Sequence, residues 1–156
     1  MSTPTTPPNY SIHSIIAAYG IGLIPHGYYF VKMMANANGL ASNILPRENL
    51  TTLKGKLPSK IWTSLARAHG AHMNAMENLP LFAVAMLAGN VAKLPTSELN
   101  TLSLEYLGAR LLYMAAYMGA RSEAVSYVRT GLWAWSVSIP VLALVKAGNV
   151  FRGKGE

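Results

Sequence analysis

The stretch RAHGAHMNAMENLPLF, residues 67–82, carries an arginine, two histidines, two asparagines and a glutamate directly before the apolar run AVAMLAGNVA. These side chains can make several charge-assisted hydrogen bonds. Ionisable residues are costly inside a bilayer, and those that occur there mark functional sites by default. The stretch therefore indicates a functional site on a membrane helix.

In an α-helix these polar residues fall on one side. With about 100° between successive residues, Arg67, Asn74 and Asn78 lie within roughly 40° of one another. Gly70 and Glu77 flank them on the same side. In a bilayer such a stripe has to face other helices or a hydrated cavity.

A second polar stripe is predicted further along the chain. Tyr106, Arg110, Tyr113 and Tyr117 share a face about 60° wide on a helical wheel. Two helices therefore each carry one polar stripe on an otherwise apolar body.

The composition favours a membrane protein. Apolar residues make up 51% and charged residues 12% of the chain, whereas soluble proteins contain about 25% charged residues. The 13 basic residues exceed the 6 acidic ones, but they are spread along the chain, and membrane headgroups are as good a partner as nucleic acid. We expect membrane lipids, and no nucleic acid, as partners. The absence of cysteine excludes disulfides, thiolate metal sites and a thiol nucleophile in the protein itself.

One all-α domain of four helices is expected. No charged residue occurs from residue 11 to residue 31, which is enough to cross a bilayer core that requires about 20 residues. Pro25 predicts a kink in this helix. Thr96 or Ser97 is expected to cap the third helix and Ser122 the fourth. The predicted helices occupy residues 11–36, 59–91, 97–118 and 123–146.

The segments outside the helices are expected to be irregular. A disordered lead is predicted at residues 1–10 and a basic tail at residues 148–156, so that the membrane domain covers residues 11–147. Pro, Gly and Asn in residues 41–60 predict a polar loop. The alternative to a membrane bundle is a soluble one, but a soluble bundle shows many more Glu–Lys pairs on its outer faces.

Together the two polar stretches resemble the MAPEG family, the membrane-associated proteins in eicosanoid and glutathione metabolism. The family pattern has an arginine, Ala-His/Gln-x-Asn-x-x-Glu and Pro-x-Phe on its second helix, and Ala-Arg-x-x-Tyr/His-x-x-x-Tyr on its third. Both halves occur here in order and at matching separation, and the resemblance covers residues 60–145. The first helix, with LIPHGYYF, is similar to members found in fungi.

This resemblance implies a transmembrane four-helix bundle that assembles as a homotrimer in the endoplasmic reticulum or another internal membrane, with glutathione bound between subunits. The glutathione-binding residues that it implies are Arg67, Asn74, Glu77, Arg110, Tyr113 and Tyr117. Arg67 would bind the glutathione carboxylates, and Glu77 would also pair with an arginine of the bundle. Alternatively, Glu77 only neutralises Arg67 or Arg110, and the tyrosines only pack between helices.

In the family an arginine at the start of the fourth helix stabilises the glutathione thiolate. Arg129 is the best match, and Arg121 is its rival. The thiolate would attack a lipophilic small molecule that reaches the subunit cleft from the membrane. The predicted activity is that of a glutathione transferase or peroxidase, and the sequence does not identify the physiological substrate.

One departure from the family pattern is Gly70, where many animal members have an arginine. A charge-assisted hydrogen bond contributes about 1.5–3 kcal/mol, so glutathione affinity is expected to be lower without it. The alternative function is a non-catalytic lipid-binding or scaffold protein of the same family. A glycine here also fits close packing against another helix.

His69 and His72 point away from the Arg67 stripe. We expect interhelical hydrogen bonds from them rather than a metal site, because no carboxylate joins them on that face. A weak excess of basic residues in the first and third loops favours a cytosolic position for these loops. The glycosylation sequons at Asn9 and Asn49 are expected to report this orientation.

Overall fold

The computed structural model describes residues 7–153, and within them all regular structure is helical. The four long helices are α1 (Ser11–Asn36), α3 (Ser59–Val91), α4 (Thr96–Gly119) and α5 (Glu123–Arg152). The first loop contains the short 3-10 helix η1 (Pro46–Glu48) and the short helix α2 (Asn49–Thr52). The all-α fold class is therefore confirmed.

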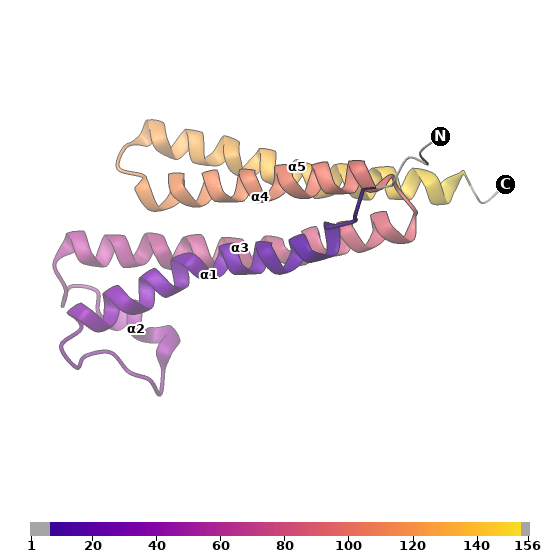
Figure 1. The fold of residues 1–156 in the computed structure, drawn as a ribbon. Helices are drawn as coiled ribbons and strands as arrows, with labels where there is room; N and C mark the ends of the chain where they lie inside the picture. The colour runs from indigo at the N-terminus through magenta and orange to yellow at the C-terminus, as the bar shows by residue number, and fades with distance from the viewer. Residues whose placement is uncertain (1–6, 154–156) are drawn as a thin grey trace.

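The long helices form two pairs, with α1 beside α3 and α4 beside α5 (Figure 1). Helices α3 and α4 each pack against all the other long helices, so they form the centre of the bundle. The first loop and the α4–α5 turn lie together at one end, which we call the loop end (Figure 1). The α4 stripe is buried at Tyr106, Arg110 and Tyr113, whereas the α3 stripe reaches the surface.

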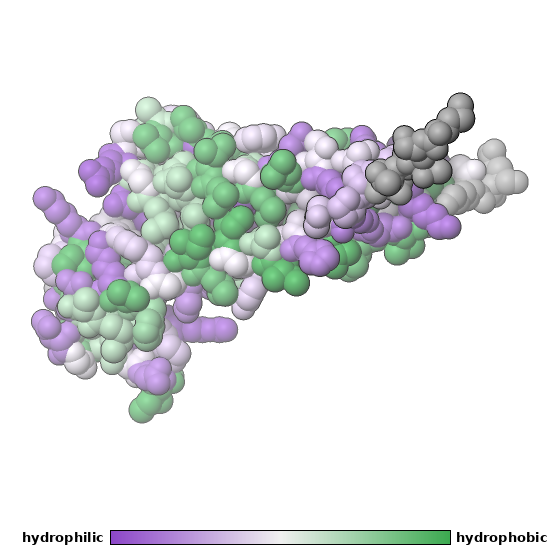
Figure 2. Space-filling view, in the orientation of Figure 1, coloured by the Kyte–Doolittle hydropathy of each residue, from purple (hydrophilic) through white to green (hydrophobic). Residues whose placement is uncertain are grey.

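The outside of the bundle is suited to lipid. Helices α1 and α5 have the length and apolar composition needed to cross a membrane. Large apolar side chains on both are exposed, among them Ile16, Val31 and Val145. Figure 2 shows apolar side chains gathered over the middle of one face and polar ones towards its two ends. Such a band is expected where hydrocarbon surrounds the helices.

The core away from the loop end is built around an aromatic pair. The rings of Phe82 in α3 and Tyr106 in α4 stack with centroids 3.9 Å apart and an interplanar angle of 6°. Fully buried alanines, Ala85, Ala109 and Ala143, lie in the same cluster. Small residues of this kind let membrane helices approach closely, so this half of the bundle is tightly packed.

Two helix ends differ from the sequence-based expectation. Neither Thr96 nor Ser97 caps α4, because the N-cap position falls on Pro95, which makes no side-chain cap. Ser122 does cap α5, and its side chain accepts a hydrogen bond from the Val125 backbone NH. Helix α5 continues beyond residue 146 to Arg152, because Gly148 keeps a helical backbone and the helix stops only before Gly153.

The first loop is more ordered than its composition predicts. Leu53 and Leu57 are buried against α1 and α3, and the Trp62 indole NH donates to the Leu50 carbonyl over 2.9 Å. The buried Asn49 side chain accepts a hydrogen bond from the Ser42 NH and donates to the Ser42 carbonyl. These two hydrogen bonds hold the Asn49 side chain in the folded loop.

The predicted lead at residues 1–10 is only partly described, since residues 1–6 lie outside the described range. Residues 8–10 are held by the bundle. Asn100 donates from its side chain to the Pro8 carbonyl and accepts from the Tyr10 NH, while Asn9 donates to the Asn90 side chain. These contacts fasten the start of α1 to α3 and α4.

The proline inside α1 is supported by a histidine of α3. Pro25 has no NH to donate to the preceding turn and its ring crowds that turn. The Gly22 carbonyl in this turn lies 2.9 Å from Nδ1 of His72, which must be the donor because a carbonyl only accepts. His72 thus makes the expected interhelical hydrogen bond. His69 instead packs its ring 5.7 Å from the ring of Tyr29.

We expect His72→Phe to destabilise the protein by about 1 kcal/mol, because the Gly22 carbonyl loses its interhelical donor in a membrane interior. Thermal unfolding of the purified protein in detergent measures the change. His69→Phe is the matched control, since His69 makes ring contacts but no hydrogen bond within residues 7–153. An equal effect of the two substitutions would show that the hydrogen bond contributes nothing.

Candidate functional site

An open pocket of about 260 Å³ lies on the side of the bundle between side chains of α3, α4 and α5. We call it the outer pocket. Its lining residues are Asn74, Tyr113, Tyr117, Arg129, Thr130 and Trp133. Four of the residues predicted from the sequence, Asn74, Tyr113, Tyr117 and Arg129, therefore meet in one space although they come from three helices.

The cation of the outer pocket is Arg129. Its guanidinium lies 4.8 Å from the ring centroid of Tyr117, and Nη2 donates to the Ser126 hydroxyl over 3.0 Å. The rings of Tyr113 and Tyr117 meet edge to face at 5.6 Å. No carboxylate in the described part of the chain pairs with Arg129. Its positive charge is therefore held in place by aromatic and hydroxyl groups, and it is available to an anion.

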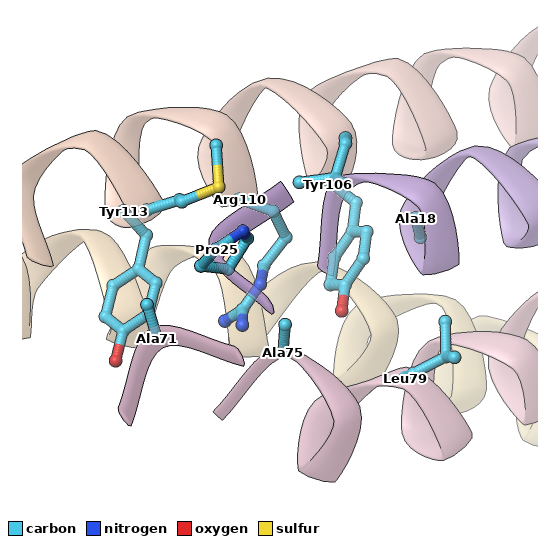
Figure 3. A pocket seen from close by; sticks show the side chains of 10 residues that line it. Ala18, Pro25, Ala71, Ala75, Leu79, Tyr106, Arg110 and Tyr113 are labelled. Carbon is cyan, nitrogen blue, oxygen red and sulfur yellow. The ribbon is translucent and has the colours of Figure 1, made fainter. Parts of the chain in front are cut away.

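Beneath the outer pocket lies a buried arginine. Arg110 points from α4 towards Ala75 of α3, with Tyr106 and Tyr113 on either side (Figure 3). Its Nη2 donates to the Asn74 side-chain oxygen over 2.9 Å, Nη1 lies 3.4 Å from the Ser136 hydroxyl, and the guanidinium lies 4.7 Å from the Tyr113 ring centroid. The interior space beside it is only about 10 Å³, so Arg110 positions other residues rather than facing a cavity.

The bond from Arg110 fixes the orientation of the Asn74 amide. The Asn74 oxygen accepts from Arg110 and, more weakly, from Asn78 Nδ2 at 3.4 Å. The amide nitrogen of Asn74 is then left as a donor at the outer pocket. A pocket with an oriented amide donor, a cation and two phenols suits a ligand that has both carbonyl and anionic groups.

Two predicted site residues lie elsewhere. Arg67 lies nearer the loop end and donates from Nη1 to the Ala120 carbonyl, beside a different and larger cleft. Glu77 is exposed on α3 and makes no ion pair with an arginine, since the ion pair found within residues 7–153 joins Lys146 and Glu98. Within the described part of the single chain Glu77 therefore has no arginine partner, since Arg110 is directed towards Asn74.

Gly70 is a packing position. A Cβ atom added to it would lie 2.5 Å from the Tyr117 hydroxyl oxygen and 3.0 Å from Cζ of the same ring. The absence of a side chain lets the phenol of Tyr117 rest directly on α3. The space beside Gly70 is therefore filled by a tyrosine from the neighbouring helix.

The two candidates for the thiolate-stabilising arginine lie in different places. Arg129 lines the outer pocket together with Tyr117, whereas Arg121 lines the larger cleft at the loop end. Sequence reasoning did not find Thr130 or the part that Trp133 takes in the pocket wall. Helical spacing could have predicted the position of Trp133, because it follows Arg129 by one turn and shares its face.

Two apolar helices long enough to cross a bilayer, with large apolar side chains on their outer faces, indicate an integral membrane protein. Over residues 12–149 the sequence matches the MAPEG family. The chain belongs to this family, which includes glutathione transferases and peroxidases as well as non-catalytic members. No curated protein and no solved structure was found to match.

We expect Gly70→Ala to lower stability by about 1–3 kcal/mol, because the added methyl group overlaps the Tyr117 hydroxyl. Tyr117→Phe removes the nearest overlapping atom, so the same change should cost less in that background. Thermal unfolding of the four proteins in one detergent measures the coupling. Gly27→Ala is the matched control, since nothing lies within 4 Å of a Cβ atom there. Equal costs in both backgrounds would contradict the packing role.

Proposed function

We propose that this protein is an integral membrane glutathione transferase or peroxidase that activates the glutathione thiolate against lipophilic electrophiles. The observation that carries the proposal is the outer pocket, in which Arg129, Asn74 and Tyr117 meet on a MAPEG family chain. We propose an internal membrane such as the endoplasmic reticulum as its location, with the loop end in the cytosol.

The residues predicted from the sequence in and around the outer pocket have proposed roles. The Asn74 amide binds the peptide of glutathione, and Tyr113 and Tyr117 bind through their hydroxyls at the edge of the apolar region. Arg110 holds Asn74 from beneath. At the margins, Arg67 is proposed to bind a glutathione carboxylate and Glu77 its amino group.

The proposed chemistry begins with ionisation of the thiol. A free thiol has a pKa of about 8.5 and is a poor nucleophile while protonated. The guanidinium of Arg129 favours the thiolate, and each unit by which the thiol pKa falls corresponds to about 1.36 kcal/mol. The thiol proton leaves to water, and the sulfur lone pair forms a bond to an electrophilic carbon as the leaving group departs, or to a peroxide oxygen as the O–O bond breaks.

We further propose a homotrimer. Glu77 and Glu105 are exposed on helices that pack within the membrane domain, and neither has an ion pair in the described residues. A charged carboxylate facing hydrocarbon costs about 3 kcal/mol or more, so these faces call for polar partners outside the chain. The outer pocket, at about 260 Å³, is also smaller than the usual range for ligand sites. A neighbouring subunit packed over the outer pocket would enlarge this site and supply polar partners for the two carboxylates.

The second candidate is a non-catalytic lipid-binding or scaffold protein. The observation that favours it is Gly70, because the Tyr117 phenol occupies the space beside it and no arginine is present there for a glutathione carboxylate. On this alternative, Arg129 has a packing role beneath the phenol of Tyr117.

We expect Arg129→Gln to abolish the ultraviolet absorbance of the enzyme-bound glutathione thiolate, because the charge that stabilises it is lost. The thiol pKa should return towards about 8.5. Arg121→Gln is the control, since Arg121 lines another cleft, and it should leave the absorbance unchanged. The opposite outcome would reassign the thiolate to Arg121, and no thiolate signal in the unmodified protein would favour the non-catalytic candidate.

We expect mass measurement in mild detergent to give three copies of the chain. Glu77→Ala should weaken the trimer, because the substitution removes a polar contact that only another subunit can satisfy. Glu123→Ala is the control, since Glu123 lies in the first turn of α5 next to a turn. A stable monomer for the unmodified protein would exclude the assembly.

A further inference from the structure

A cleft of about 660 Å³ lies at the loop end of the bundle. Four of its lining residues are cationic, namely Lys32 of α1, Lys60 and Arg67 of α3, and Arg121 of the α4–α5 turn. No lining residue is acidic. We call it the basic cleft. Because four positive charges face one space without a carboxylate, the basic cleft is suited to an anion.

The donors of the basic cleft are held in position. The Lys32 amine donates to the Tyr28 hydroxyl over 2.7 Å and to the Ser64 hydroxyl over 3.0 Å. An ammonium group has three donors, so one remains free. Arg67 is fastened through Nη1 to the Ala120 carbonyl, while its Nε is buried and has no hydrogen-bond partner among the described residues. The remaining donor of the Lys32 amine is therefore available to a bound anion.

The position of the basic cleft matches the depth of lipid headgroups. Lys32 lies near the end of α1, Lys60 near the start of α3, and Arg121 between α4 and α5. All these elements meet at the loop end, where the chain leaves the helices (Figure 1). Because the membrane-spanning helices end here, this is the level at which we expect the phosphate groups of a bilayer, just outside the hydrocarbon core.

An apolar track leads away from the basic cleft along α1. Ile24, Tyr28 and Val31 share one helical face and are exposed to 52%, 39% and 67%. Tyr28 also lines the basic cleft, so the track is continuous with it. A free anion makes no apolar contact with such a track, whereas the acyl chains of a lipid can pack along it.

We propose that the basic cleft binds the phosphate of an anionic phospholipid whose acyl chains lie along the outer face of α1. The site is separate from the outer pocket, since the two share no lining residue. Lipid binding here fixes the depth of the bundle at one leaflet.

The test measures binding of phosphatidic acid to the full-length protein in detergent by native mass spectrometry, with phosphatidylcholine as the comparison lipid. Lys60→Gln together with Arg121→Gln removes two cations of the basic cleft. These two side chains are exposed, so the fold should be unaffected. We expect phosphatidic acid to bind the double variant at least about tenfold more weakly, the loss for about one charge-assisted hydrogen bond.

The matched control is Arg47→Gln with Lys56→Gln, which removes two exposed cations from the first loop outside the basic cleft. We expect this variant to bind as the unmodified protein does. Equal weakening in both double variants would overturn the proposal in favour of diffuse surface charge. Equal binding of phosphatidylcholine would also overturn it. Displacement by glycerol 3-phosphate would assign the basic cleft to a free phosphate compound, and displacement by glutathione would make it part of the glutathione site.

Discussion

The arrangement of the bundle depends on one buried guanidinium. Arg110 is only 5% exposed and has no carboxylate partner within the described chain. A buried charge without compensation costs several kcal/mol. Here it is compensated by the Asn74 amide of α3, the Ser136 hydroxyl of α5 and the face of the Tyr113 ring. Because these groups come from three helices, the guanidinium fixes their mutual register, and a shift of any one helix would leave the charge unsatisfied.

The same bond connects the interior to the surface pocket. Arg110 donates a hydrogen bond to the Asn74 side-chain oxygen, so the Asn74 side-chain nitrogen remains as the donor for a ligand. Gly70 lets Tyr117 reach α3, and Tyr117 in turn supports the guanidinium of Arg129. The proposed thiolate site is therefore assembled by side chains that hold one another across helices, and the ligand would meet groups that are already oriented.

The two ends of the bundle differ in their chemistry. At the loop end, buried leucines of the first loop pack against α1 and α3, and the cations of the basic cleft gather beside them. At the opposite end, asparagines of α3 and α4 hold the start of α1 through hydrogen bonds. Both ends therefore have polar anchors, and the middle of the face in Figure 2 presents apolar side chains.

The sequence by itself determined the fold class, the family and the helices that carry the polar stripes. These follow from local periodicity and from residue types at fixed spacing, which do not depend on how helices meet. It also indicated an interhelical hydrogen bond from His72, because this side chain points away from the Arg67 stripe and has no carboxylate beside it on that face.

Only the tertiary structure decided which polar residues share a space. Arg67 and Asn74 lie on one stripe of α3, yet they line different clefts, because Tyr117 of α4 packs on Gly70 between them. Likewise, Arg129 and Arg121 line different clefts, and Glu77 is exposed although it flanks the same stripe. A helical wheel gives the direction of a side chain around its own axis, but the partner it meets depends on packing between helices, which single-helix periodicity does not contain.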